Sequence, residues 1–516
     1  MKIKRALISV SDKRGLEELA RGLNELGVEL ISTGGTAERI SKAGIPVKEV
    51  SDITKFPEML GGRVKSLHPA IFGGILAERT ENHLAQLQEQ NIEPIDLVVC
   101  NLYPFAKVIS SVDATEDQAI ENIDIGGPSM IRAAAKNFKY VAVVVEPNDY
   151  GAVLEELRET KGELSPKTRK QLAIKAFQHT ADYDGLIYRY LSDYSADNEL
   201  FPEFYDYRLK KVMDLRYGEN PHQKAALYQD LKINEPSLVQ AEQLNGKALS
   251  YNNINDTNAA LELLNEFFEP TVVAVKHTNP CGVASHDDIA QAYQLAYEAD
   301  PVSIFGGIVA CNRTVTKEMA EKLSKIFLEV VVAPDYQEEA LSILKKKANL
   351  RILKLPGLSP DARKPAITMQ KIVGGVLIQE RDLGSLKNVE PKQVTAGTLD
   401  ESLKEDLEFA WKIVKHVKSN AIVVAKNKQT LGVGAGQMNR IDAAIKAIEA
   451  AGKEAEGAVL ASDAFFPFDD VVKEVVKAGI KGVIQPGGSI RDEDSIAVLN
   501  EAKTPMVFTG MRHFRH

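Results

Sequence analysis

Short apolar runs alternate with amphipathic stretches along the first 150 residues. Buried strands are predicted at 6–10 (ALISV), 28–31, 97–101 (LVVCN) and 140–145 (YVAVVV). A helix is predicted over 15–26, where leucines recur at helical spacing, and another over 37–43. Strands that alternate with helices predict a parallel sheet covered by helices on both faces.

The pattern changes between residues 161 and 206. This stretch is first helical and charged, and then aromatic and acidic (YSADNELFPEFYDY). A chain of 516 residues is also too long for one ordinary hydrophobic core. We therefore predict a domain boundary near residue 198, which separates a domain over 1–198 from one over 199–516.

The second domain contains an internal repeat with a period of about 150 residues, too long for a solenoid. VAVKHTNPCGVA (273–284) aligns without gaps on VVAKNKQTLGVG (423–434). Two later pairs follow in the same order: DPVSIF (300–305) with DAFFPF (463–468), and VVAP (331–334) with GVIQP (482–486). Chance similarity between apolar strands is the alternative, but the shared order favours a duplicated α/β subdomain.

Composition, cysteine positions and the lengths of apolar runs exclude several classes of protein. The chain is 44% hydrophobic, carries a net charge of −9 and has one Trp, so it lacks the basic surface that nucleic-acid binding needs. Cys100, Cys281 and Cys311 lie far apart, which argues against a disulfide framework or a zinc knuckle. The first apolar run is too short for a signal peptide, and no apolar stretch is long enough to span a membrane. We expect a soluble, cytoplasmic protein with neither nucleic acid nor membrane as a partner.

Two turns after predicted strands carry groups that bind phosphate. SVSDK (9–13) follows the first strand, and STGGT (32–36) follows the second. Hydroxyls, a lysine and backbone N–H groups at helix N-termini together make an anion-binding cradle. A Gly-Gly pair after a strand is also typical of a plain tight turn. The phosphate hypothesis therefore requires both turns to lie at one end of one sheet.

GGRVKSLHP (61–69) brings Arg63, Lys65 and His68 into a predicted exposed loop. A solvated charged surface is the alternative, although it does not call for the glycines and the proline that flank the basic residues.

Two further segments place polar groups near strand or helix ends. CNLYPF (100–105) sets Asn101 and Tyr103 at the carboxyl end of a strand, where open α/β sheets bind ligands. An aromatic cap on the core is the alternative for Tyr103. In NIDIGGPSMIRAAAKN (122–137), two glycines open a helix on which Arg132 and Lys136 share a face.

The second domain offers LRYGENPHQK (215–224) and KHTNPCG (276–282). Neighbouring residues on a strand point to opposite faces, so Lys276 and His277 can serve one site only if the strand ends there. The following Asn-Pro predicts that it does. No second Cys or His follows Cys281 at ligand spacing, so we expect no zinc site.

Nine motifs, in order along both domains, resemble those of the family that joins 5-aminoimidazole-4-carboxamide ribonucleotide (AICAR) formyltransferase to inosine monophosphate (IMP) cyclohydrolase. They are SVSDK, TGGT, GGRVKSLHP, CNLYPF, IDIGG, LRYGENPHQ, KHTNPCG, SDAFFPF and the final Arg-x-Phe-x-His.

The resemblance implies an α/β fold: a methylglyoxal-synthase-like parallel-sheet domain, then a transferase of two duplicated cytidine-deaminase-like halves. It implies formyl transfer from 10-formyltetrahydrofolate to AICAR, and then dehydrative closure of formyl-AICAR to IMP. It also implies a cytoplasmic homodimer that acts on small molecules, with no catalytic metal, and it allows a structural monovalent cation.

For the transferase, the resemblance implies that His277 is the general base for the weakly nucleophilic amine of AICAR and that Lys276 stabilises the developing oxyanion. The implied AICAR-site residues are Arg216, Tyr217, Gly306, Glu329, Asn420, Arg440, Phe465 and Arg512. Glu329 stands where some members of the family have Asp. The implied folate-site residues are Ile441, Asp470, Ser489 and Ile490.

For the cyclohydrolase, the catalytic candidates by resemblance are Lys65, Tyr103, Asp124 and Lys136. Which of Lys65 and Lys136 transfers the proton stays open. The implied nucleotide-contact residues are Ser11, Asp12, Lys13, Thr33, Gly34, Gly35, Thr36, Arg63, Val64, Ser66, Cys100, Asn101 and Ile125. The phosphate cradle would belong to this site.

Two alternatives to a bifunctional enzyme stay open at this point. A single-activity formyltransferase could carry the first domain as a scaffold, or residues 1–198 could be a non-catalytic nucleotide or phosphate sensor, because fold alone does not fix function. The presence of both candidate catalytic sets favours the bifunctional enzyme.

Overall fold

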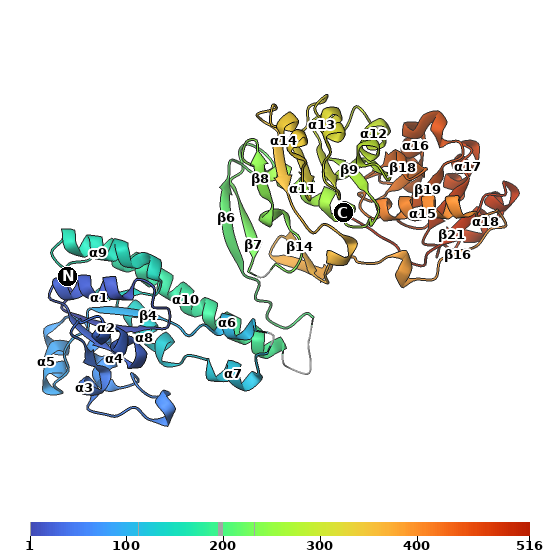
Figure 1. The fold of residues 1–516 in the computed structure, drawn as a ribbon. Coiled ribbons are helices and arrows are strands. Elements are labelled where there is room, and N and C mark those ends of the chain that lie inside the picture. The colour runs from blue at the N-terminus through green and yellow to red at the C-terminus, as the bar shows by residue number, and fades with distance from the viewer. Residues whose placement is uncertain (1, 112, 194–199, 232) are drawn as a thin grey trace. The chain divides into compact units, whose positions relative to one another are not determined.

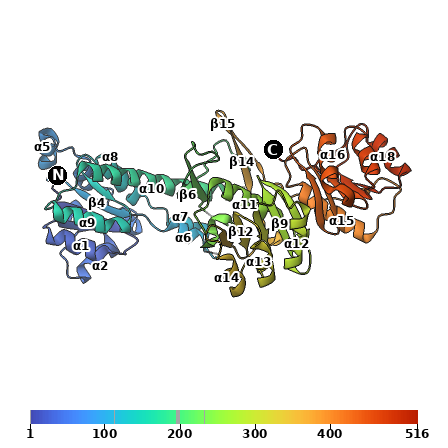
Figure 2. The same cartoon turned by 90° about the horizontal axis from the view of Figure 1, so that it is seen from above.

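The chain divides into two compact units, Met1–Asp206 (unit 1) and Tyr207–His516 (unit 2), drawn in Figures 1 and 2. The computed structural model describes residues 2–111, 113–193, 200–231 and 233–516. The boundary predicted near residue 198 falls in 194–199, outside the described residues.

Unit 1 is built on a five-stranded, all-parallel sheet with the order β3-β2-β1-β4-β5. The strands are β1 (Arg5–Val10), β2 (Glu29–Ser32), β3 (Lys48–Glu49), β4 (Leu97–Asn101) and β5 (Ala142–Val144). The predicted parallel sheet is confirmed, and the four predicted strands coincide with β1, β2, β4 and β5.

Helices cover both faces of this sheet, as predicted. They are α1 (Leu16–Glu25), α2 (Gly34–Lys42), α3 (Val50–Thr54), α4 (Pro69–Leu76), α5 (Glu81–Glu89), α6 (Phe105–Ile109), α7 (Glu116–Glu121), α8 (Gly126–Lys136), α9 (Tyr150–Glu159) and α10 (Pro166–Asp193). Neighbouring strand residues face opposite sides. Ile8 therefore packs with α1 and α9, whereas Leu7 packs with α4, α8 and α10.

Helix α2 begins three residues earlier than the sequence predicted, at Gly34 instead of residue 37. STGGT is thus the N-terminus of a helix, with Thr33 as its N-cap. Glycine is a poor helix former, which hides this start in the sequence. Two glycines in the first turn leave the backbone N–H groups there open to a ligand.

Unit 2 is built on a 12-stranded mixed sheet with the order β16-β21-β20-β19-β17-β18-β10-β9-β11-β12-β13-β8. Its strands are β8 (Glu242–Asn245), β9 (Thr271–Lys276), β10 (Asn279–Ser285), β11 (Ile308–Cys311), β12 (Val330–Ala333), β13 (Arg351–Lys354), β16 (Lys392–Gln393), β17 (Ile422–Lys426), β18 (Gln429–Gly434), β19 (Val459–Ser462), β20 (Gly482–Gln485) and β21 (Met506–Phe508). Two separate hairpins are β6 (Leu209–Leu215) with β7 (Ala225–Asp230), and β14 (Ile367–Ile372) with β15 (Gly375–Glu380).

The helices of unit 2 repeat the order of the strands. Those of the first half are α11 (Tyr251–Leu264), α12 (Ile289–Ala299), α13 (Lys317–Leu323) and α14 (Glu338–Leu344). Those of the second half are α15 (Glu401–Val414), α16 (Arg440–Ala451), α17 (Asp470–Lys477) and α18 (Asp492–Glu501). Helices α11 and α15 pack in one core that spans both halves, and the other helices cover the opposite face.

The predicted duplication is confirmed by this order. Hairpins β9–β10 and β17–β18 correspond to the gapless repeat, and they meet at the centre of the sheet through the β10–β18 pair. The match of VVAP with GVIQP is also right, because β12 and β20 occupy equivalent places. The match of 300–305 with 463–468 is wrong: the first segment precedes β11, whereas the second follows β19. Both are short aromatic segments beside a strand, so the sequence alone did not separate them.

Candidate functional site

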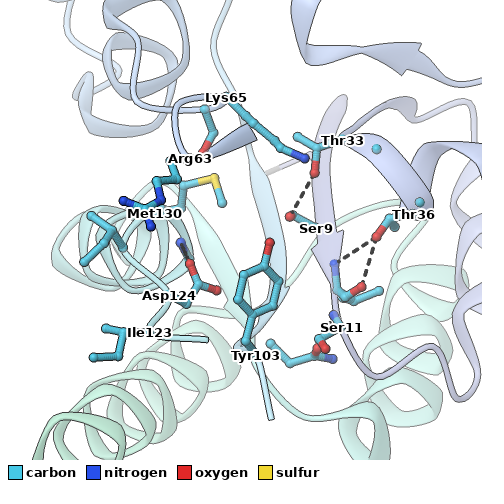
Figure 3. Close-up of a pocket in the computed structure, with 18 of the residues that line it drawn as sticks. Ser9, Ser11, Thr33, Thr36, Arg63, Lys65, Tyr103, Ile123, Asp124 and Met130 are labelled. Atoms are coloured by element: carbon cyan, nitrogen blue, oxygen red, sulfur yellow. Dashed lines mark hydrogen bonds between the residues drawn. The ribbon is translucent and has the colours of Figure 1, made fainter. Parts of the chain in front are cut away.

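A cavity of about 560 Å³ opens in unit 1 at the carboxyl ends of β1, β2 and β4 (Figure 3). The turns SVSDK and STGGT both line it, so they lie at one end of one sheet as the phosphate hypothesis requires. The predicted residues in its lining are Ser11, Lys13, Thr33, Gly34, Gly35, Thr36, Arg63, Lys65, Ser66, Asn101, Tyr103, Asp124 and Ile125.

Four predicted residues lie outside this lining: Asp12, Val64, Cys100 and Lys136. Lys136 is the last residue of α8, whose first residues line the cavity. At 1.5 Å per residue, the two ends of this helix are about 15 Å apart. The structure therefore does not bring Lys136 to the cavity, and of the two lysine candidates only Lys65 reaches it.

The N-terminus of α2 forms one wall of the cavity. The backbone N–H groups of Gly34 and Gly35 have no acceptor within the described part of the chain. A Cβ placed on Gly34 would lie 3.5 Å from Nζ of Lys65, so the lysine amine lies beside this helix end. Figure 3 shows this amine near Thr33, whose hydroxyl is 3.1 Å from that of Ser9. Cations and free N–H groups at a helix N-terminus favour a bound anion.

Other polar groups of the predicted cradle already make hydrogen bonds that hold the two turns in place. The Thr36 hydroxyl donates to the carbonyl of Val10 at 3.0 Å. The backbone N–H groups of Ser11 and Asp12 both donate to Oδ1 of Asn101, at 2.6 and 2.8 Å. The expectation that the N–H groups of both turns converge on a phosphate is thus wrong for Ser11 and Asp12. Their partner is an amide that comes from β4.

Asp124 precedes α8 and is the cavity's partly buried carboxylate. Its Oδ1 accepts a hydrogen bond from the N–H of Gly127 at 2.8 Å, and its own N–H donates to the hydroxyl of Tyr183. Burial raises the pKa of the Asp124 carboxyl. A Cβ on Gly127 would lie 2.5 Å from Oδ2 of Asp124, so a side chain there would displace the carboxylate. A carboxyl group whose pKa is raised is suited to proton transfer near neutral pH.

Two carboxylates that pair with cations of the cavity lining were not predicted from the sequence. Glu121, at the end of α7, pairs with Arg63, and Glu58 lies 3.3 Å from Nζ of Lys65. The Arg63–Glu121 pair joins residues 58 positions apart, so no local spacing signals it. Figure 3 shows the Tyr103 ring between Asp124 on one side and Ser9 and Ser11 on the other.

In unit 2, Lys276 and His277 lie where β9 ends and turns into β10, as predicted. Nζ of Lys276 donates to the carbonyl of Phe305 at 2.8 Å, and a Cβ on Gly306 would lie 3.2 Å from that Nζ. The N–H of Glu329 donates to the carbonyl of Gly307. The structure thus brings Lys276, Gly306 and Glu329 together.

A second group of predicted residues lies at the start of β17. Oδ1 of Asn420 accepts from Nη2 of Arg440 at 2.8 Å. Asp463, which is fully buried, pairs with Arg440 and accepts from the N–H of Ala421, the residue after Asn420. The N–H of Lys418 donates to Oδ1 of Asn279, which ties this group to the hairpin that carries His277. Asp463 was not recognised as a site residue, although it lies in the SDAFFPF motif.

The remaining predicted residues of unit 2 are more scattered. Arg216 stacks on the Tyr217 ring just after β6, and Arg512 lies over Phe514 in the C-terminal segment. Phe465 follows Asp463 by two residues. Among the folate candidates, Ile441 and Asp470 lie in the first turns of α16 and α17, whereas Ser489 and the fully exposed Ile490 lie in the loop after β20.

Among the described residues, no group of three or more His, Cys, Asp or Glu side chains is arranged to hold a metal ion. No helix in the described ranges is long and apolar enough to cross a membrane.

Comparison with known proteins identifies the family. A family model described as the AICARFT/IMPCHase bienzyme matches residues 134–450, and one described as an MGS-like domain matches residues 15–129. The bifunctional purine biosynthesis protein PurH of Acetivibrio thermocellus is 55% identical over 515 residues, 100% of both chains. The protein of the same name from Thermoanaerobacter sp. (strain X514) is 56% identical over 514 residues, 99% of this chain and 100% of its own. The crystal structure of ForH is 38% identical and covers 37% of this chain and 99% of its own, with a TM-score of 0.34.

The fold defines a class of protein: a parallel-sheet MGS-like domain, with a cavity at the carboxyl ends of its strands, joined to a unit that contains an internal duplication. The chain belongs to the AICARFT/IMPCHase bienzyme family. It is a bifunctional enzyme of purine biosynthesis, an AICAR formyltransferase and IMP cyclohydrolase that acts on small molecules and uses a folate one-carbon donor. This finding supports the bifunctional enzyme over the single-activity alternative. The likeness of each half of unit 2 to cytidine deaminases stays a prediction.

Proposed function

We propose that the two activities are divided between the two units: the cavity of unit 1 closes formyl-AICAR to IMP, and the β9–β10 hairpin of unit 2 carries the formyl transfer. The observation that supports this division most strongly is the unit 1 cavity, which combines an open helix N-terminus, two lysines and a carboxyl group of raised pKa. These are the groups that a phosphorylated substrate and a dehydrative ring closure need.

In ring closure, the carboxamide nitrogen of formyl-AICAR attacks the formyl carbon. The carboxamide nitrogen and the formamido nitrogen each lose one proton, and the formyl oxygen leaves as water. Asp124 takes the proton from the carboxamide nitrogen as the C–N bond forms. Lys65 and Tyr103 lie in the same cavity and donate to the formyl oxygen as it gains negative charge. The α2 N-terminus and Lys13 hold the phosphate. Lys65, and not Lys136, is the lysine of this step.

In formyl transfer, the amine of AICAR attacks the formyl carbon of 10-formyltetrahydrofolate, and N10 of the folate leaves with a proton. His277 removes the amine proton, since this conjugated amine is a weak nucleophile. Lys276 stabilises the oxyanion of the tetrahedral intermediate. Asn420 and Arg440 bind AICAR, and Ile441 and Asp470 bind the folate from the first turns of α16 and α17.

The finer expectations on assembly and cofactors are part of this proposal. We propose a cytoplasmic homodimer that takes 10-formyltetrahydrofolate as its donor and holds a structural monovalent cation. Two isolated hairpins support the dimer, because two strands alone are only marginally stable in water. Both expose large apolar side chains, among them Met213 and Tyr228 on one hairpin and Val373 and Leu377 on the other.

The proposal is tested by supplying each substrate separately. The protein given AICAR and 10-formyltetrahydrofolate should produce IMP, and given formyl-AICAR alone it should also produce IMP. Lys65→Ala should stop the second reaction while formyl-AICAR still accumulates in the first. Equal loss of both reactions in Lys65→Ala would contradict the division between units.

A further inference from the structure

The turn that presents His277 has a conformation that its own residues disfavour. His277 and Thr278 have φ angles of 50° and 62°, in the left-handed region. A two-residue hairpin with both central residues at positive φ prefers Asn and Gly, and a β-branched residue such as Thr278 is an outlier there. Strain of this kind persists only where the surroundings impose the conformation.

The surroundings of this turn are hydrogen bonds on both sides of the His277–Thr278 peptide. The carbonyl of His277 accepts from the Thr278 hydroxyl at 2.7 Å and from Nδ2 of Asn279 at 3.1 Å. The next N–H, that of Thr278, donates to Oδ1 of Asp256 at 2.8 Å. Asp256 belongs to α11, a buried helix of the core, and it provides the contact that ties the turn to a rigid element.

The corresponding turn of the second repeat is also held by an aspartate. The β17–β18 turn has Asn427 and Lys428 at φ 53° and 55°. Their N–H groups both donate to the carboxylate of Asp406, at 2.8 Å each, and Asp406 lies on α15, the counterpart of α11. In this copy Asn427, which tolerates the left-handed region, takes the place of His277. An aspartate at the sixth position of its helix thus holds each of the two turns, of which only one carries a histidine.

We propose that Asp256 is a positioning residue for formyl transfer: its carboxylate holds the His277–Thr278 turn in the left-handed conformation and so fixes where the imidazole is presented. This inference rests on the proposed role of His277. Asp256 acts through the backbone of the turn and does not itself touch the reacting atoms. Because a misplacement of about 1 Å can lower a rate roughly 100-fold, loss of this contact reduces turnover more than binding.

The test compares Asp256→Ala and Asp256→Asn with Asp406→Ala, the matched variant in the repeat without a histidine. Steady-state formyl transfer is measured with AICAR and 10-formyltetrahydrofolate, and ring closure with formyl-AICAR. Asp256→Ala should lower kcat for formyl transfer roughly 10- to 100-fold and leave KM for AICAR and the ring closure unchanged. Asp256→Asn keeps an acceptor for the Thr278 N–H and should regain most of kcat. Asp406→Ala removes the acceptor of two N–H groups and should lower Tm, with kcat unchanged.

Three results would overturn the inference: unchanged kcat in Asp256→Ala, a defect in Asp256→Asn as large as in Asp256→Ala, or an equal loss of kcat in Asp406→Ala. If Asp256→Ala does not fold, Asp256→Ser, which shortens the side chain and keeps a polar atom, carries the same expectation. His277→Ala, measured alongside, separates this inference from the proposed function. Full formyl transfer in His277→Ala contradicts the base assignment, whereas its loss together with normal turnover in Asp256→Ala contradicts only the positioning role.

Discussion

Oδ1 of Asn101, at the end of β4, accepts a hydrogen bond from the backbone N–H of Ser11 at 2.6 Å, although 90 positions separate the two residues. The same oxygen accepts from Asp12, and Nδ2 of Asn101 donates back to the Asp12 carbonyl at 3.1 Å. The buried amide therefore serves the turn that precedes Lys13. Asn101 shapes the cradle, and in the proposed site the direct contacts to the phosphate fall to Lys13 and the α2 N-terminus.

Asn101→Ala should weaken IMP binding by roughly 10-fold. The turn loses three hydrogen bonds of about 1 kcal/mol each, and part of the binding energy of IMP is then needed to order the turn. Binding is measured by calorimetry on the full chain. Formyl transfer in unit 2 is the control and should not change. IMP affinity equal to that of the wild type would show that the turn holds its shape without Asn101.

Lys13→Ala should weaken IMP binding by roughly 10- to 100-fold, since a charge-assisted hydrogen bond contributes about 1.5–3 kcal/mol. Inosine lacks the phosphate and should bind the variant and the wild type equally poorly. An equal loss of affinity for inosine and IMP would mean that Lys13 supports the fold or the base, and the cradle would be misplaced.

Glu121→Gln should tighten IMP binding, by up to about 5-fold, because Glu121 is a carboxylate that competes with the bound nucleotide for Arg63. The gain is small since exposed ion pairs contribute only about 0–1 kcal/mol. The measurement is IMP affinity at low and high salt, and the advantage of the variant should shrink as salt screens the pair. Weaker binding in Glu121→Gln would show that Glu121 orients Arg63 and does not compete for it.

Asp124→Asn should make unit 1 more stable at pH 7 and slow its ring closure. Burial raises the pKa of Asp124 in the folded chain, so its contribution favours folding below the unfolded pKa of about 3.9 and is lost as pH rises through the folded pKa. At pH 7 the buried charge destabilises the unit. Asparagine keeps the acceptor for the Gly127 N–H and removes that charge.

The Asn variant should therefore melt at a higher temperature than the wild type at pH 7, and the difference should shrink as the pH approaches 4. Ring closure should fall by roughly 10²- to 10⁴-fold, the usual effect of losing a general base. A lower Tm at pH 7, or unchanged ring closure, would remove Asp124 from the role proposed for it.

Local patterns predicted four of the five strands of unit 1, its parallel sheet and the duplication of unit 2, because buried strands are continuous apolar runs and a gapless repeat keeps its register. Both ends of β4 were predicted correctly. The start of α2 was missed because Gly34 and Gly35 are poor helix formers, although glycines there leave room for a ligand.

Contacts between distant segments could not be predicted. The sequence predicted that the N–H groups of Ser11 and Asp12 bind a phosphate, but they donate to Asn101 instead. The Arg63–Glu121 pair joins a loop to a helix, and no local spacing signals it. Lys136 shares α8 with residues that line the cavity, yet it lies at the other end of that helix. A motif places residues in order along the chain, and only the fold decides which of them meet.

The central claim, that two separate sites perform the two reactions, is tested most directly by the rate at which His277→Ala converts supplied formyl-AICAR to IMP. We expect this rate to equal that of the wild type, while the same sample makes formyl-AICAR from AICAR and 10-formyltetrahydrofolate about 10²- to 10⁴-fold more slowly. Loss of ring closure together with formyl transfer, in a variant whose Tm is unchanged, would contradict the account.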